Sequence, residues 1–304
     1  MRCLADLHHG DLYRSLLLLF EKRLGHEVYR PIGMDWFDEG YWRYLFPARA
    51  TASQYLSEGP YPHLKGAELA RVKAGEFDLL ISSTPPMFYA FERLIREHAL
   101  KAKHVFQSGN DWLCMPEVRN FLNSTTVQAP PHVHEVKYHQ EFSLTDYCPP
   151  ATPPGRVISS FMHYMPEPEK FYALEAAMPG WTFRAFGAGN RDGQPADLVQ
   201  AMRETRYLYH QKEVEAYGYN TWYAAACGIP IIMKVARNRH QSIGAVLNEE
   251  TSIDLERPQV LPAVLRRFDA DHEFHRARMY AAFCNAVDFD AEEARIRKWM
   301  EGLK

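Results

Sequence analysis

Residues 215–232 read EAYGYNTWYAAACGIPII, and this stretch decides the fold class of the chain. Its middle part, residues 219–227, predicts a helix of small and aromatic side chains. Gly228 is a typical helix end, and the apolar run over residues 229–234 predicts a buried strand. A helix that leads directly into a buried strand indicates an α/β protein with a parallel sheet.

Strand and helix patterns alternate in the same way along the rest of the chain. Strands are expected over residues 3–6, 26–30, 77–82, 104–107, 125–128, 156–162, 181–186 and 207–210. Helices are expected over residues 11–24, 65–74, 84–98, 167–178, 195–205 and, at the end of the chain, 291–303. Repeated strand-helix-strand units place their strands in parallel sheets.

A proline-rich stretch at residues 148–155, CPPATPPG, divides the chain near its midpoint. Four prolines in eight residues exclude regular structure and predict a stiff, extended connector. We therefore expect a first domain over residues 1–147, this linker, a second domain over residues 156–288 and a C-terminal helix within residues 289–304. Two α/β domains joined in this way imply an interdomain cleft, which is a favoured place for a ligand.

Composition narrows the class of protein. The 304 residues include 46% hydrophobic and 24% charged residues, which is ordinary for a globular protein of about two domains. The net charge of -3 argues against a generally basic nucleic-acid binder, although not against a local basic groove. The five cysteines show no metal-binding spacing, and no apolar run approaches the ~20 residues that cross a bilayer. A reduced, cytoplasmic protein without membrane insertion is expected.

Gly218 and Glu215 are the residues of the opening stretch that point to chemistry. Gly218 precedes the expected helix, where unpaired N–H groups and the helix dipole favour an anion such as a diphosphate. Glycine also permits close approach of a ligand to the backbone. Glu215 lies three residues earlier and can face a sugar hydroxyl. The alternative is an ordinary turn that binds nothing.

The whole stretch resembles the donor-site signature of GT-B glycosyltransferases: an acidic residue, an aromatic, glycine, a helix and Cys-Gly-x-Pro before a strand. This resemblance implies two Rossmann-like parallel-sheet domains that face a cleft, with Tyr217, Tyr219 and Asn220 beside Gly218 at a UDP- or GDP-sugar donor. It also implies a C-terminal helix that crosses back to the first domain. The family often has a second glutamate at the position of Tyr223, so the ribose must be recognised differently here.

Further donor-binding residues follow from the register of that resemblance. Ser160 ends the first strand after the linker, where the family contacts phosphate, and Gly187 and Gly189 form a nucleotide-side loop after the next strand. Lys234 and Arg237 follow a later strand and can neutralise a diphosphate. A solvated basic loop is the alternative for these two cations.

Two loops of the first domain can supply a general base if the transfer inverts the sugar. Asp111 resembles the base position of bacteriophage DNA β-glucosyltransferases, and His9 resembles the base of plant and antibiotic glycosyltransferases. Asp111 is placed first and His9 second. Asp11 is third, since a helix N-cap is the better explanation for it. In a retaining mechanism, Glu215 would instead lie near the transferred sugar.

The most specific acceptor hypothesis is a 5-hydroxymethylpyrimidine in phage DNA. It rests on the small size of the chain and on the opening at residues 4–13, which resembles phage and environmental proteins. A saccharide or small-molecule acceptor remains open, as do a nucleotide-sugar epimerase and a non-catalytic nucleotide-sugar binder. The aromatic stretch at residues 36–61 is either an acceptor platform or a satellite core.

No cofactor or metal is expected to be tightly bound. The sequence shows no DxD-like pair and no Cys/His cluster at a convincing spacing. Helix-terminal N–H groups and cationic side chains can stabilise a diphosphate without a metal. The sequence sets no oligomeric state.

Overall fold

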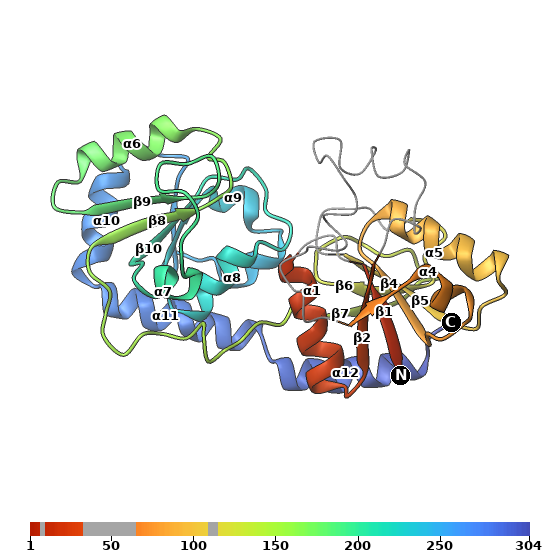
Figure 1. Ribbon diagram of the computed structural model, residues 1–304. Helices are drawn as coiled ribbons and strands as arrows, with labels where there is room; N and C mark the ends of the chain where they lie inside the picture. The colour runs from red at the N-terminus through yellow and green to blue at the C-terminus, as the bar shows by residue number, and fades with distance from the viewer. Residues whose placement is uncertain (7–9, 33–64, 109–114) are drawn as a thin grey trace. The chain divides into compact units, whose positions relative to one another are not determined.

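The computed structural model describes residues 1–6, 10–32, 65–108 and 115–304 (Figure 1). Contacts between residues divide the chain into two compact units. The first unit comprises Met1–Phe142 together with Phe289–Lys304, and the second comprises Ser143–Asp288. Each unit is built around its own parallel sheet, as the sequence predicted.

The first unit contains a seven-stranded parallel sheet. Its strands, in spatial order, are β3 (Gly66–Ala67), β2 (Glu27–Pro31), β1 (Arg2–Ala5), β4 (Leu79–Ser82), β5 (Lys103–Ser108), β6 (Asn120–Asn123) and β7 (His134–Lys137). The chain moves outward from β1 to β3 and then returns to the other side of β1 with β4. The strand order therefore reverses between β1 and β4.

Helices cover both faces of this first sheet. They are α1 (Gly10–Leu16), which continues as the π-helix η1 (Leu17–Arg23), α4 (Leu69–Lys73), α5 (Pro85–Glu97) and α12 (Phe289–Glu301). Helix α12 packs beside α1 on one face, where Ile296 and Trp299 join the buried core (Figure 1). The ring of Trp299 stacks on His134 of β7, with ring centroids 5.6 Å apart. The last helix of the chain is thus part of the first unit.

The second unit contains a five-stranded parallel sheet. Its spatial order is β12 (Ser252–Asp254), β11 (Ile231–Met233), β10 (Tyr207–His210), β8 (Val157–Phe161) and β9 (Thr182–Phe186). Its helices are α6 (Pro168–Ala177), α7 (Leu198–Arg203), α8 (Tyr219–Ala226), α9 (Val235–Asn238), the 3-10 helix η2 (Ser242–Val246), α10 (Leu261–Ala270) and α11 (His272–Ala286). The strand order reverses between β8 and β10.

The proline-rich stretch belongs to the second unit, which begins at Ser143. Its carbonyl groups are held by arginines of that unit. Arg206 donates to the carbonyl oxygen of Pro154 over 2.9 Å, and Arg276 donates to that of Pro150. The prolines therefore form a strap packed on the second unit.

One expected strand is wrong. Residues 125–128 form no strand, and β6 and β7 lie on either side of them. The side-chain oxygen of Asn123 accepts hydrogen bonds from the backbone N–H and the hydroxyl of Thr125, both over 2.9 Å. This Asx-type contact bends the chain immediately after β6. The basic segment after β11, for which a solvated loop was the alternative interpretation, begins with the short helix α9 (Val235–Asn238).

Within the described part of the chain, no helix combines the length and the apolar character needed to cross a membrane.

Acidification is expected to destabilise the second unit through His272. This side chain is 4% exposed, and its ring packs against Tyr207 with centroids 5.4 Å apart. Burial, with a contribution from the positive charge of Arg206, lowers the pKa of His272 from 6.5 to about 4. Between these two values the unfolded chain binds a proton that the folded chain does not, so the free energy of unfolding falls as the pH falls.

The expected loss is about 2 kcal/mol between pH 7 and pH 5, measured by urea denaturation. The variant His272→Gln cannot titrate and should lose less stability over the same interval. The pKa of Glu215 is also lowered, but this carboxyl changes the free energy of unfolding mainly below pH 4.5, so it contributes little between pH 7 and pH 5. Parallel pH curves for the two proteins would contradict this assignment.

Candidate functional site

The carboxyl edge of the second sheet forms a topological switch point between β8 and β10. Open parallel α/β sheets bind ligands at such a point, outside the carboxyl ends of the strands. Helix α8 begins there, and its Asn220 side chain donates to the carbonyl oxygen of Phe161, the last residue of β8, over 2.6 Å. The amino end of α8 is therefore fixed to the end of β8.

Gly218 is the N-cap of α8 and has a left-handed backbone with φ +57°. A Cβ atom at this position would lie 2.3 Å from Cγ of Glu215 and 2.8 Å from Oγ1 of Thr221. Glycine is thus required by the protein's own packing as well as by its backbone angle. Since glycine has no side chain, Gly218 makes no side-chain cap hydrogen bond to the first turn of α8, which suits an anion.

Glu215 is 4% exposed and forms hydrogen bonds with the side chains of a histidine and a lysine. His210, at the end of β10, contacts Oε2 over 2.7 Å, and Lys212 donates to Oε1 over 2.9 Å. Burial raises the pKa of the Glu215 carboxyl, but His210 and then Lys212 outweigh this effect and lower the pKa to about 2. A carboxylate with so low a pKa is a poor general base. Its geometry suits a fixed negative charge that positions its neighbours.

His210 is a site residue that the sequence reasoning missed. An ionised carboxylate only accepts hydrogen bonds, so Nε2 of His210 carries the proton that it shares with Glu215. Its other nitrogen, Nδ1, is buried and has no hydrogen-bond partner among the described residues. The available signal was a histidine at the carboxyl end of a predicted strand, five residues before Glu215.

Ser160, Gly187 and Gly189 surround the end of β8. Ser160 is fully buried, and its hydroxyl has no partner among the described residues. Gly187 has φ +137°, and a Cβ there would lie 1.8 Å from the carbonyl oxygen of Met162. A Cβ on Gly189 would lie 2.1 Å from the ring of Tyr164. The two glycines therefore allow the loop after β9 to pack directly against the loop after β8.

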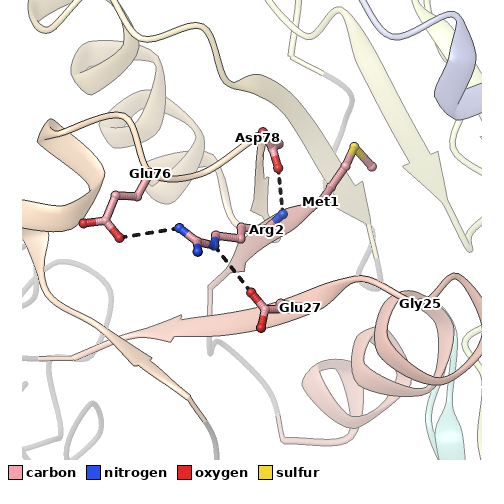
Figure 2. Close-up of a pocket in the computed structure, with 6 residues that line it drawn as sticks. All are labelled: Met1, Arg2, Gly25, Glu27, Glu76 and Asp78. Carbon is pink, nitrogen blue, oxygen red and sulfur yellow. Dashed lines mark hydrogen bonds and ion pairs between the residues drawn. The ribbon is translucent and has the colours of Figure 1, made fainter.

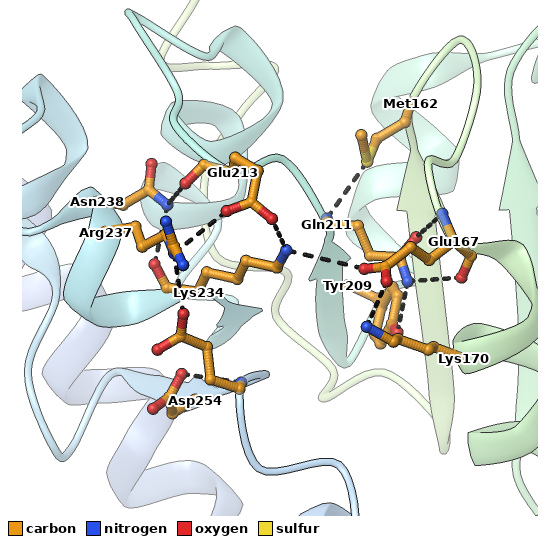
Figure 3. Close-up of polar contacts among 11 residues, drawn as sticks. Met162, Glu167, Lys170, Tyr209, Gln211, Glu213, Lys234, Arg237, Asn238 and Asp254 are labelled. Carbon is orange, nitrogen blue, oxygen red and sulfur yellow. Dashed lines mark hydrogen bonds and ion pairs between the residues drawn. The ribbon is translucent and has the colours of Figure 1, made fainter.

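Lys234 and Arg237 lie beside three glutamates (Figure 3). Lys234 pairs with Glu213 and lies 3.8 Å from Oε2 of Glu167. Arg237 lies 3.2 Å from Glu213 and 3.0 Å from Glu256. Both cations expected to meet a diphosphate are thus neutralised by carboxylates, and Glu213 contacts both of them. A diphosphate would have to replace Glu213 as their partner.

The aromatic residues of the stretch at residues 215–232 pack within the second unit. Tyr217 is 1% exposed and lies near the rings of Tyr219 and Trp222. Tyr223, at the position of the family's second glutamate, is 2% exposed and stacks on Tyr147 with ring centroids 3.9 Å apart. That position is therefore filled by an aromatic pair from α8 and the segment before the proline strap.

Asp111 and His9 lie outside the described residues, as does the aromatic stretch at residues 36–61; of Asp11 only the backbone is described. The structure does describe the ends of the two strands that precede His9 and Asp111 in the chain. β1 ends at Ala5 and β5 ends at Ser108, and both point to the same edge of the first sheet.

Asp6 and Ser83 meet at that edge, where the strand order of the first sheet reverses. Asp6 is 4% exposed, and its carboxylate accepts the backbone N–H of Ser83 over 2.6 Å and also its hydroxyl. Beside them, Ser82 contacts Nε2 of His104 over 2.8 Å, and Nδ1 of His104 contacts Glu92 over 2.6 Å. Ser82 is fully buried, so this chain of hydrogen bonds rigidifies the edge and presents no nucleophile.

A cavity of about 400 Å³ lies at the opposite, amino edge of the first sheet (Figure 2). Arg2 crosses it and pairs with Glu27 over 3.4 Å and with Glu76 over 4.0 Å. Asp78 accepts the backbone N–H of Arg2 over 2.8 Å. These charges satisfy one another, and the cavity lies away from the carboxyl edge, so we assign it no ligand.

Across the described residues, no group of three or more His, Cys, Asp or Glu side chains is arranged to hold a metal ion.

Solved structures with the same fold match this chain over nearly its whole length. They include Anabaena Alr3699/HepE in complex with UDP-glucose (TM-score 0.70, 13% identity, 100% of both chains). A glycosyltransferase from Rickettsia africae has a TM-score of 0.69 at 9% identity, with 99% of this chain and 98% of that chain covered. Sucrose-phosphate synthase from Thermosynechococcus elongatus has a TM-score of 0.64 at 12% identity, with the same coverage.

No protein-family model and no curated protein sequence matches the chain. The structural similarity defines the fold as GT-B, with two parallel-sheet α/β units, and this confirms the fold class predicted from residues 215–232. The structural neighbours are glycosyltransferases. At identities of 9–13%, this structural similarity establishes the fold alone, and the activity has to be argued from the site.

Proposed function

We propose that this protein is a glycosyltransferase that binds a nucleoside-diphospho sugar at the carboxyl edge of the β8–β10 switch point. The observation that carries the proposal is the amino end of α8, capped by Gly218 and fixed to the end of β8, within a GT-B fold. The complex of HepE with UDP-glucose favours a UDP-sugar, with a GDP-sugar as the alternative.

The residues around α8 have distinct roles in this proposal. The first N–H groups of α8 would hold the diphosphate, whereas the hydroxyl of Ser160 is fully buried and is given no direct contact with it. Lys234 and Arg237 would exchange Glu213 for the diphosphate and offset its negative charge. Glu215, held by His210, would position the first turn of α8 and remain ionised throughout.

The chemistry needs one further group, a base for the acceptor. In an inverting transfer the acceptor oxygen forms a bond to the anomeric carbon, and the bond from that carbon to the diphosphate oxygen breaks. The proton of the acceptor hydroxyl goes to the base, and the nucleoside diphosphate leaves as an anion. Asp111 is our first candidate for the base and His9 the second. Fixed cations and helix N–H groups stabilise the leaving diphosphate, so we propose a metal-independent transfer.

Calorimetric titration with UDP-glucose and GDP-mannose tests the donor site. We expect one of the two nucleotide sugars to bind and to raise the thermal midpoint of unfolding, because a ligand at 100 times its Kd stabilises the folded state by about 2.7 kcal/mol. Binding should persist in excess chelator. Free glucose serves as the control and should not bind. Failure of a broad panel of nucleotide sugars to bind would overturn the proposal.

The acceptor is the less constrained part of the proposal. A structural neighbour named sucrose-phosphate synthase favours a saccharide acceptor, whereas the opening of the chain led to 5-hydroxymethylpyrimidine DNA as the most specific hypothesis. Incubating labelled donor with oligosaccharides, with hydroxymethylated DNA and without acceptor separates these cases. Turnover without an acceptor would indicate an epimerase, and binding without any turnover would indicate a non-catalytic binder. Transfer in the cytoplasm remains our expectation for a chain of this composition.

A further inference from the structure

Tyr164 is the most exposed large hydrophobic side chain among the described residues, with an exposed fraction of 71%. It lies in the loop between β8 and α6, at the carboxyl edge of the second sheet. Single exposed hydrophobic side chains are common on protein surfaces, so exposure alone does not mark a ligand site. The surroundings of Tyr164 show that its exposure does not result from a loose loop.

The loop below Tyr164 is held by a set of short contacts. The ring lies directly on Gly189, where any Cβ atom would be 2.1 Å from Cδ1 of the tyrosine. The backbone N–H of Gly189 donates to the carbonyl oxygen of His163 over 3.0 Å. Asn190 donates to the carbonyl oxygen of Met162 over 2.6 Å. One side of the ring therefore rests on a fixed backbone, and the rest of the ring is open to solvent.

The position of Tyr164 relates it to the amino end of α8. Phe161, whose carbonyl oxygen binds the Asn220 side chain of α8, precedes Tyr164 by three residues. Three extended residues span at most ~11 Å, so the two Cα atoms are no farther apart than this. An extended nucleoside diphosphate whose phosphates lie at the start of α8 can therefore reach the ring.

We propose that Tyr164 stacks on the nucleobase of the donor and thereby supplies part of its affinity. This inference rests on the proposed function, since it needs a nucleotide at the β8–β10 switch point. A planar base is the ligand group that matches an open tyrosine face, and such stacking depends little on which base is present. The absence of a side chain at Gly189 is then explained, because any larger residue would displace the ring.

The test compares three ligands with four variants by calorimetry. The ligands are UDP, GDP and inorganic pyrophosphate, which has no base. We expect Tyr164→Ala to weaken binding of the nucleotide that the wild type binds by about tenfold and to leave pyrophosphate binding unchanged. Tyr164→Phe should retain nucleotide affinity, because the ring is kept. Gly189→Ala should reproduce the loss, because it displaces the ring while Tyr164 remains.

Phe274→Ala is the matched control, since Phe274 is another exposed aromatic residue but lies on α11, near the amino end of β10. It should bind every ligand as the wild type does. Unchanged nucleotide affinity in Tyr164→Ala would overturn the inference while the donor site stands. An equal loss for pyrophosphate would overturn it as well, because the ring would then only support the phosphate site. If the wild type bound pyrophosphate but no nucleotide or nucleotide sugar, the proposed function itself would fail.

Discussion

Replacement of Asp111 with asparagine is expected to lower the rate of sugar transfer by about 10²–10⁴-fold and to leave donor affinity nearly unchanged. The change keeps the shape of the side chain and removes the charge that would accept the proton of the acceptor. Donor affinity should persist because the residues proposed to hold the donor all belong to the second unit. Initial rates and calorimetric donor titrations measure the two quantities separately.

His9 is the competing candidate for the base. β1 and β5 are separated in the sheet only by β4, so the loops that carry His9 and Asp111 begin roughly 10 Å apart at the same edge. If His9 is the base, His9→Ala carries the large loss and Asp111→Asn has little effect. Asp78→Asn is a suitable control, because Asp78 lies at the amino edge of the same sheet. Full activity of both Asp111→Asn and His9→Ala would leave the retaining scheme, with Glu215 near the transferred sugar, as the better mechanism.

Substitution of Gly218 with alanine is expected to remove detectable transfer and to weaken donor binding at least tenfold. Alanine meets two costs at this position. A left-handed backbone costs a residue with a Cβ about 1–2 kcal/mol, and the Cβ would also collide with Cγ of Glu215 at 2.3 Å. Glu215 would be pushed away from His210, and a buried carboxylate that loses a hydrogen bond is itself destabilising.

A larger residue at Gly218, as in Gly218→Val, would block the approach of a ligand and would also perturb the protein without any ligand. Gly180→Ala is a matched control for the backbone term, because Gly180 has φ +84° and open space around its Cα. The excess loss of stability in Gly218→Ala over Gly180→Ala measures the collision with Glu215. A Gly218→Ala protein that binds donor with unchanged affinity would refute the placement of the donor at α8.

Much of the fold followed from local patterns in the sequence. Thr84 was expected to begin a helix and is the N-cap of α5, with prolines in its first turn. The helix predicted over residues 219–227 is α8, one residue shorter. The strand predicted over residues 207–210 is β10. These predictions succeeded because helix starts, glycine helix ends and buried apolar runs depend on neighbouring residues. A short stretch of sequence is therefore enough to recognise them.

The strands β6 and β7 were missed for a physical reason. β6 is Asn-Phe-Leu-Asn and β7 is His-Glu-Val-Lys, so neither has an apolar run of strand length, and Val136 is their one β-branched residue. They form strands because β6 pairs in parallel with the edge of β5, and β7 pairs in parallel with the edge of β6. Each partner strand lies about a dozen residues away along the chain, which is beyond the few neighbouring positions that a local pattern covers.

By itself, the sequence determined the parallel α/β architecture and the glycine at the start of α8, because strand runs, helix periodicity and turn residues act over a few neighbouring positions. Only the tertiary structure decided what surrounds that glycine. It brought His210 to Glu215, three glutamates to Lys234 and Arg237, and Tyr164 onto Gly189. The His210–Glu215 contact closes within the connection from β10 to α8, and the others join different loops at the carboxyl edge of one sheet. That edge exists only once the strands have paired.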